Sequence, residues 1–449
     1  MTVSRMTFSD RLSRLRPTAF VLYAGLAGFT AYFSMYAFRK PFTAATFADL
    51  PDWAGQIDYK VVLVIAQAVG YALSKWIGVK LIAEVGCGRR AALILGLIAT
   101  SWLALVLFAV VPRPWNIAAL FLNGLPLGLI WGLVFSYMEG RRVSDVLGAI
   151  LCASFIVSSG VVKAAGKLLL QAGVNEFWMP AAVGGLFAPL LLIAVLGLSQ
   201  IPAPDAEDER QRTRRVPMDR QQRRRFLATY WPGLIMLVVA YILFSAFRDF
   251  RDNFAAEIWE ALGYGDQAAV FVTSEVPVAV LSLAAMAGLV WVKRNHQALM
   301  LIHLVMTGGA LLLGLSTLAF MAGGMSPFVW VLCTGAGVYI VYTPFNAVLF
   351  DRLIATTGQV ANAGFLIYVA DASGYVGSLG LLLYRSLATP NLDWVPFFQG
   401  AALLTSAAGV VCFGASALYF WKRTGDGVES PPVVVGNAAR DLQATHEGY

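Results

Sequence analysis

Two arginines set in long apolar stretches are the residues of this chain whose surroundings point most directly to chemistry. Arg39 ends the pattern AYFSMYAFR (residues 31–39), and Arg248 ends the related pattern AYILFSAFR (residues 240–248). A charge at lipid depth is costly and is seldom present without a partner, a cavity or a ligand. A guanidinium group presents a planar fork of donors that matches carboxylate or phosphate oxygens. The pair therefore predicts a cradle for one small anion, unless each arginine is neutralised within its own half, as Arg248 would be by Asp252 four residues later.

Further ionisable side chains lie in apolar sequence. Lys75, Lys163 and Arg251 add positive charge, and an excess of such charge favours an anion as ligand. Lys75 fits a substrate contact and an internal salt bridge equally well. Asp371 and Glu275 are the most isolated carboxylates. Each is either a proton carrier or a counter-ion of Lys163 or Arg251.

Tyrosines accompany the two arginines. Tyr32 and Tyr36 share one helix face with Arg39, because they precede it by seven and three residues. Tyr241 occupies the position in the second pattern that Tyr32 has in the first. These side chains either line the same site or form ordinary hydrogen bonds between helices.

Composition indicates a membrane protein built from helices. The chain is 58% hydrophobic and 13% charged, whereas soluble domains carry about a quarter charged residues. Its apolar stretches repeatedly exceed the ~18 residues that indicate a membrane span. We expect an all-α fold of twelve transmembrane helices, arranged as two pseudo-symmetric bundles of six. The expected spans are 17–47, 60–84, 90–111, 115–138, 144–171, 178–199, 230–254, 267–292, 298–322, 327–350, 360–386 and 395–421.

The order of these spans predicts four parts of the chain. An N-terminal six-helix bundle (1–199) is followed by a charged cytoplasmic linker (200–229), a C-terminal six-helix bundle (230–422) and a cytoplasmic tail (423–449). Most lysines and arginines outside the spans fall on the side of the N-terminus. This asymmetry predicts a multi-pass protein of the inner (plasma) membrane with both termini in the cytoplasm. Lys60 lies near an expected helix end, so we expect it at the membrane interface. Lys40 either lies at membrane depth or extends its side chain to the interface.

Several classes of protein are excluded. The net charge is +7, but the positive residues are distributed according to the side of the membrane, so the charge does not indicate nucleic-acid binding. The four cysteines and three histidines are scattered without the spacing of a disulfide framework or a metal site. No cluster of His, Asp or Ser lies near one membrane face, which argues against an enzyme. We expect no metal and no cofactor.

Two short motifs resemble a known family. The first expected span ends in YAFRKPF (residues 36–42), and the second contains SKWI (residues 74–77). Both are similar to motifs of the organophosphate:phosphate antiporters of the major facilitator superfamily. The resemblance implies that Arg39 and Arg248 clamp the phosphate of a substrate. It also implies that Lys75 corresponds to a conserved lysine of that family.

The expected function is secondary transport, by alternating access, of a small anionic solute such as a phosphate ester or phosphate. One alternative is a membrane sensor that binds such an anion without transporting it. Another is a proton-coupled transporter of a different organic solute, which would give Asp371 or Glu275 the role of proton carrier. The expected partners are the solute and the lipid bilayer, and the expected state is a monomer.

Overall fold

The computed structural model is built of helices joined by turns and loops in the part of the chain that it describes. That part comprises residues 8–13, 16–53, 57–84, 87–139, 141, 143–203, 220–290, 292–357, 363–388 and 392–424. Ten of its helices are long and apolar enough to cross a membrane. The helices α3 and α16, which carry Lys75 and Asp371, complete the expected twelve spans. The predicted all-α membrane fold is confirmed.

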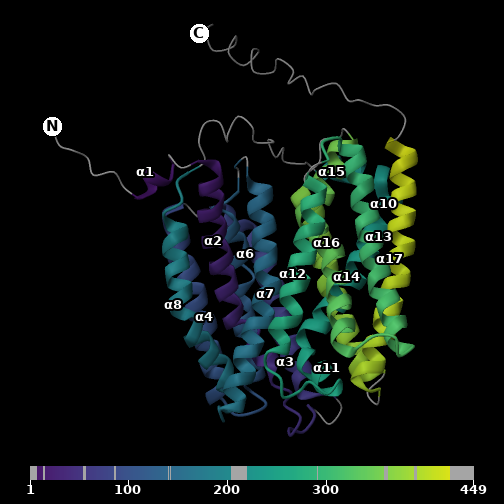
Figure 1. Ribbon diagram of the computed structural model, residues 1–449. Helices are drawn as coiled ribbons and strands as arrows, with labels where there is room; N and C mark the ends of the chain where they lie inside the picture. The colour runs from purple at the N-terminus through teal and green to yellow at the C-terminus, as the bar shows by residue number, and fades with distance from the viewer. Residues whose placement is uncertain are drawn as a thin grey trace, which may run out of the picture.

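Two bundles of helices stand side by side (Figure 1). The first bundle consists of α2 (Pro17–Met35), α3 (Tyr59–Glu84), α4 (Arg90–Val110), α5 (Ile117–Leu127), α6 (Ile130–Phe135), α7 (Ser144–Gln171) and α8 (Met179–Ser199). The second consists of α10 (Arg220–Asn253), α12 (Val270–Val290), α13 (Asn295–Met321), α14 (Pro327–Ala347), α15 (Leu349–Thr357), α16 (Ala363–Leu387) and α17 (Trp394–Thr424). Shorter elements are α1 (Phe8–Leu12), α11 (Ala255–Ala261) and the 3₁₀ turns η1 (Tyr36–Phe38), η2 (Pro41–Ala44) and η3 (Cys87–Arg89).

Three helices differ from the expected spans. The first span is helical only to Met35 and then continues as η1 and η2, with Pro41 at the first position of η2, where its missing N–H is not needed. The fourth span is divided into α5 and α6 near Pro126. The helix α10 begins at Arg220, ten residues before the expected start of the seventh span.

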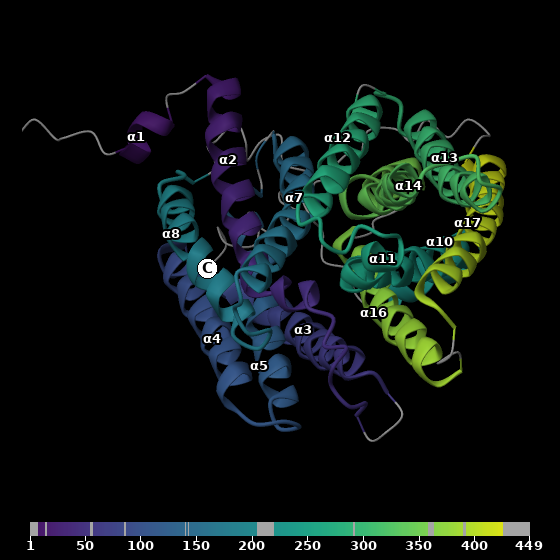
Figure 2. The same ribbon diagram turned by 60° about the horizontal axis from the view of Figure 1, so that its bottom comes forward.

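The bundles meet mainly through α7 and α12 and through α3 and α16, as Figure 2 shows for α7 and α12. The α11 helix also contacts η2. The beginning of α2 and the end of α17 lie at the same end of the molecule, which we call the terminal end, and α11 lies at the opposite end, which we call the α11 end (Figure 1).

A close crossing of α7 and α12 joins the bundles. At Gly160, an added Cβ atom would lie 2.3 Å from the carbonyl oxygen of Phe271. Real Cβ atoms do not approach so closely, so the absence of a side chain at Gly160 is what allows the two backbones to touch.

Candidate functional site

A buried ionic cluster at the α11 end joins the bundles around Asp252. One carboxylate oxygen lies 2.5 Å from Lys163 Nζ, and the other lies 2.5 Å from Lys40 Nζ. Ser159 donates a hydrogen bond to the same carboxylate, and Lys40 also donates to Asn253 Oδ1 at 2.7 Å. The side chains of Lys40 and Lys163 are 6% and 3% exposed. Of the two alternatives for Lys40, extension of its side chain to the interface is not the one observed, because a carboxylate of the other bundle holds it inside.

A second ion pair closes the same end. Lys60 Nζ lies 2.5 Å from Glu257 Oε1 and donates to the carbonyl oxygen of Thr43 at 3.0 Å. Lys60 is fully buried, because the other bundle covers this end of its helix. Glu257 belongs to α11, outside the spanning helices, and burial raises the pKa of its carboxyl to about 7 although Lys60 opposes the rise.

A third inter-bundle ion pair involves α3 and α16. Lys75 forms a salt bridge with Asp371, and Tyr241 donates a hydrogen bond of 2.9 Å to the other carboxylate oxygen. The counter-ion alternative for Asp371 is thus the one observed, but its partner is Lys75 and neither Lys163 nor Arg251. Lys75 Nζ also lies 5.4 Å and 5.1 Å from the ring centres of Tyr71 and Tyr375.

These ion pairs share one pattern of charge. Every lysine in them belongs to the first bundle, and every carboxylate belongs to the second. The attraction therefore acts between the bundles and does not stabilise either bundle alone. Breaking a buried pair is costly, because it leaves an uncompensated charge.

Arg248 and Arg251 are paired within the second bundle. Arg248 donates through Nε and Nη2 to Asp249 at 3.1 Å and 2.6 Å, and Ser378 donates to the same carboxylate at 2.7 Å. Neutralisation of Arg248 within its own half, the alternative weighed from the sequence, is thus observed, but its partner is Asp249, because Asp252 faces the lysines of the first bundle. Arg251 pairs with Glu275 at 2.7 Å, which is the counter-ion alternative expected for that carboxylate.

Arg39 differs from Arg248 in having no carboxylate partner among the described residues. Its backbone is fixed because Gln67 donates to its carbonyl oxygen at 2.8 Å, and Asn123 donates to the carbonyl oxygen of Phe38 at 2.9 Å. The guanidinium carbon lies 3.9 Å from the ring centre of Tyr71. Its Nε atom is buried without a hydrogen-bond partner.

Tyrosines of both bundles surround the central charges, meaning Arg39, Lys75, Arg248, Asp249 and Asp371. Tyr32 and Tyr36 are in edge-to-face contact at 5.6 Å, and Tyr36 lies within electrostatic range of both Arg39 and Arg248. Tyr241 stacks on Tyr342, whose ring centre lies 3.8 Å from the guanidinium carbon of Arg248.

The structure thus brings together most of the residues singled out in the sequence. Arg39, Arg248, Lys75, Tyr32, Tyr36, Tyr241 and Asp371 lie around one central site. Lys163 belongs to the cluster at the α11 end, while Arg251 and Glu275 pair inside the second bundle.

Sequence reasoning missed Tyr375, which contacts Tyr71 at 5.9 Å beside the Lys75–Asp371 pair. A signal for it was present, since Tyr375 follows Asp371 by four residues. Residues at that spacing are neighbours on a helix surface.

Exposure increases from the α11 end toward the centre. The side chains of the pairs at the α11 end are 0–13% exposed. By contrast, Lys75 and Asp371 are 28% and 18% exposed, and Arg248 and Asp249 are 16% and 22% exposed. The central groups therefore border open space, while the α11 end is closed.

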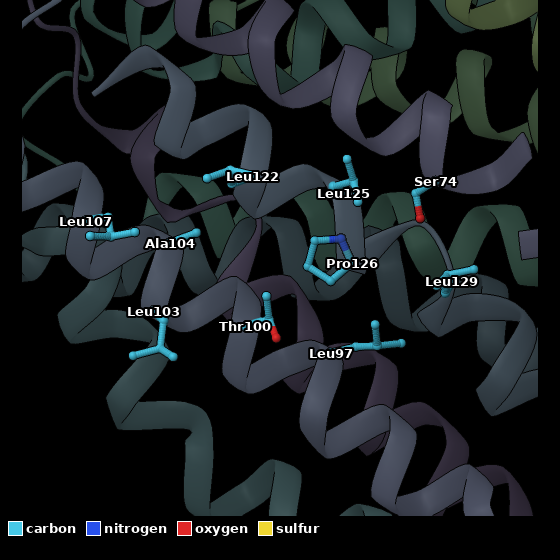
Figure 3. Close-up of a pocket in the computed structure, with 10 residues that line it drawn as sticks. All are labelled: Ser74, Leu97, Thr100, Leu103, Ala104, Leu107, Leu122, Leu125, Pro126 and Leu129. Atoms are coloured by element: carbon cyan, nitrogen blue, oxygen red, sulfur yellow. The ribbon is translucent and has the colours of Figure 1, made fainter. Parts of the chain in front are cut away.

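An apolar hollow lies elsewhere. It has a volume of about 340 Å³ and is lined by α3, α4 and α5, with Leu103, Leu107 and Pro126 in its wall (Figure 3). Ser74 and Thr100 supply its polar side chains. A wall of this composition suits lipid chains better than a charged solute. A more polar hollow of about 420 Å³, bordered by Lys167 and Glu176, lies between the bundles at the α11 end.

Comparison with known proteins gives one family match and several similar folds. Residues 41–423 match a family described as "Family of unknown function (DUF5690)". No curated protein matches the sequence.

Three solved structures are similar over nearly their whole length. A D-xylose–proton symporter has a TM-score of 0.59 at 15% identity, covering 90% of this chain and 97% of its own. A bacterial homologue of the human drug peptide transporters PepT1 and PepT2 has a TM-score of 0.59 at 14% identity, covering 91% and 100%. A variant of the nucleoside transporter NupG has a TM-score of 0.57 at 12% identity, covering 89% and 99%. At these identities the likeness shows the fold alone.

Proposed function

The chain belongs to the DUF5690 family, and we propose that it is a secondary transporter that moves a small anionic solute across the membrane by alternating access. The similar folds belong to a sugar symporter, a peptide transporter and a nucleoside transporter, which supports transport but favours no particular solute. The proposal of an anion therefore depends on the site.

The observation that carries the proposal is the unpaired charge of Arg39. Asp249 and Asp371 neutralise Arg248 and Lys75, but no carboxylate among the described residues pairs with Arg39. Within the described residues, its Nη1 and Nη2 atoms form no hydrogen bond, and unlike the buried Nε atom both keep some exposed surface. Through that surface these two nitrogens can bind an anion with two parallel hydrogen bonds.

The inter-bundle ion pairs support alternating access. Closure at the α11 end depends on lysines of one bundle and carboxylates of the other, so a rocking motion of the bundles would separate them. With the terminal end on the cytoplasmic side, as the distribution of basic residues favours, this conformation is closed to the outside. The central site then opens toward the cytoplasm.

Proton coupling is a second version of the function, and the Asp371 contacts favour it. An anion that attracts Lys75 would compete with Asp371 for that lysine. The released carboxylate could then take up a proton, which would couple the solute to a pH gradient. Exchange against phosphate, which the resemblance to organophosphate:phosphate antiporters implies, needs no such proton.

Uptake into vesicles tests the proposal. Purified protein is reconstituted in liposomes loaded with phosphate or with buffer alone, and uptake of labelled anions is measured with and without a pH gradient. We expect uptake of an anion that Arg39→Gln reduces at least about a hundredfold, because an Arg–anion contact of this kind contributes a few kcal/mol. Uptake by the Arg39→Gln variant at the wild-type rate would refute the role of this residue.

A further inference from the structure

We infer that Gln67 and Asn123 are positioning residues, which hold Arg39 in the orientation that binds the anion. The inference rests on the proposed function and concerns the support of its site. Two features point to it. The backbone around Arg39 lacks the hydrogen bonds of a continuous helix, and buried amide side chains of two neighbouring helices take their place.

The two arginines of the repeated pattern are held in different ways. Arg248 lies within the continuous helix α10, so helical hydrogen bonds fix its backbone. Arg39 instead follows the 3₁₀ turn η1, beyond the end of α2. Pro41 has no N–H and therefore cannot pair with the carbonyl oxygen of Phe38 three residues earlier. The backbone at Arg39 consequently needs partners from outside its own segment.

Two buried amide side chains supply these partners. Gln67 of α3 donates through Nε2 to the carbonyl oxygen of Arg39 at 2.8 Å and to Asn123 Oδ1 at 2.7 Å. Asn123 of α5 donates through Nδ2 to the carbonyl oxygen of Phe38 at 2.9 Å and to the hydroxyl of Ser101 at 2.6 Å. Gln67 is 4% exposed, and Asn123 and Ser101 are 0% exposed. Because a buried polar group that loses its partner costs free energy, these hydrogen bonds resist displacement of the segment.

The guanidinium group of Arg39 is supported from the same helix. Tyr71 follows Gln67 by four residues, so the two side chains lie on one face of α3. The ring centre of Tyr71 lies 3.9 Å from the guanidinium carbon of Arg39. Gln67 thus holds the backbone of Arg39 while Tyr71 supports its charged end. An arginine that is held at both ends loses less conformational freedom when it binds an anion.

A close contact of α3 with α5 makes this support rigid. A Cβ atom added at Gly124 would lie 2.2 Å from the carbonyl oxygen of Gln67. One added at Gly70 would lie 2.2 Å from the carbonyl oxygen of Phe121. The two backbones can touch because both glycines lack a side chain. Gln67 and Asn123 therefore extend from helices whose separation is fixed.

These hydrogen bonds act within the first bundle. They join η1, α3, α4 and α5, whereas the ion pairs of the α11 end join one bundle to the other. A rocking motion would separate the ion pairs but would leave the support of Arg39 intact. The arginine would then be presented to the anion in the same way from either side of the membrane.

Hydrogen exchange of the purified full-length protein tests the support itself. In Asn123→Ala, the backbone amides of residues 39–45 should exchange about tenfold faster than in the parent, because the segment loses its hydrogen bond at Phe38 and the anchor of Gln67. The amides of residues 17–30 should exchange at the parent rate. The matched control is Asn116→Ala, which removes an asparagine of α5 that is 1% exposed and accepts a hydrogen bond from Tyr59 of α3. This control should leave residues 39–45 unchanged.

Uptake of inorganic phosphate by reconstituted vesicles tests the effect on the site. Asn123→Ala and Gln67→Leu should each raise the KM about tenfold, since immobilising a freed side chain on binding costs up to about that factor. The maximal rate should stay within about twofold of the parent, because the conformational change does not use these hydrogen bonds. Asn116→Ala should keep the parent KM.

Two results would overturn the inference. One is an unchanged exchange rate of residues 39–45 in Asn123→Ala, which decides the matter even if the parent takes up no phosphate. The other is faster exchange of this segment with an unchanged KM. If Arg39→Gln reduces uptake in these cases, the proposed function stands and only the inference fails. If Arg39→Gln leaves uptake unchanged, the role of the arginine in the proposed function fails, so the two failures are distinguishable.

Discussion

Removing the charge of Asp252 should open the α11 end. This carboxylate lies 2.5 Å from both Lys40 Nζ and Lys163 Nζ and is 13% exposed. The Asp252→Asn variant keeps the shape of the side chain but leaves two buried lysines without their counter-ion. Breaking a buried pair costs about 3–5 kcal/mol. In the conformation that is open at the α11 end, water can hydrate both lysines, so the cost falls on the closed conformation.

The change in the ratio of closed to open conformations follows from that cost. We take the lower value, about 3 kcal/mol, because Lys40 keeps its hydrogen bond to Asn253 and Asp252 is not fully buried. This energy changes the ratio of closed to open conformations by about a hundredfold. A closed protein should thus become one that samples the open conformation extensively.

Cysteine labelling measures the shift. Ala256 of α11 is 8% exposed, so an Ala256→Cys variant, made after replacement of the four native cysteines, should react slowly with a membrane-impermeant maleimide. Adding Asp252→Asn should raise the labelling rate about ten- to a hundredfold. The control is Asp266→Asn, which removes an exposed carboxylate at the same end.

Two results would refute this reasoning. One is a labelling rate that Asp252→Asn leaves unchanged in protein of normal thermal stability. The other concerns the double variant Asp252→Asn, Lys163→Gln. Its labelling rate should return toward that of the parent, since removing a lysine together with its counter-ion leaves less unpaired charge. A rate that stays as high as in Asp252→Asn would contradict the reasoning.

Three further predictions concern the same interface. Raising the pH from 6 to 8 should lower the ratio of closed to open conformations about tenfold, since the pKa of Glu257 is about 7 when buried and would fall to its ordinary value on hydration, so that protons favour closure. The maleimide labelling rate, divided at each pH by the rate of the denatured protein to remove the effect of thiol ionisation, should show this dependence in the parent but not in Glu257→Gln. Gly160→Ala should reduce uptake severalfold, because the added Cβ would lie 2.3 Å from the carbonyl oxygen of Phe271, whereas Gly96→Ala, whose Cβ meets open space, should leave uptake unchanged. Asp371→Asn should abolish any stimulation of uptake by a pH gradient if Asp371 carries the proton, and stimulation that persists would exclude it from that role.

The helices could be predicted from the sequence because hydropathy and length suffice to locate spans in lipid. The repeated pattern that ends in Arg39 and Arg248 also identified two residues of the central site, since both lie within electrostatic range of Tyr36. The positions of the helices and of these two arginines could be predicted because each depends on a short stretch of sequence or on a repeated pattern.

The pairing of charges could not be predicted in the same way. Asp252 follows Arg248 by four residues, which favoured a pair on one helix, but the lysines of the other bundle compete for it successfully. Lys40 and Lys60 lie near helix ends, and hydropathy alone places such residues in water. Their burial depends on Asp252 and Glu257, which are more than 190 residues away in the chain. Contacts of this kind depend on how the two bundles dock.

The distribution of charge between the bundles has a consequence for biosynthesis. While the chain is being made, Lys40, Lys60, Lys75 and Lys163 enter the membrane before any of their counter-ions has been translated, because Asp252, Glu257 and Asp371 all follow in the second half. Until α10, α11 and α16 are in place, the nascent first half must keep four lysines hydrated or shielded by insertion factors. A first half produced alone should therefore be a target for membrane quality control, and supplying the second half as a separate polypeptide should rescue it.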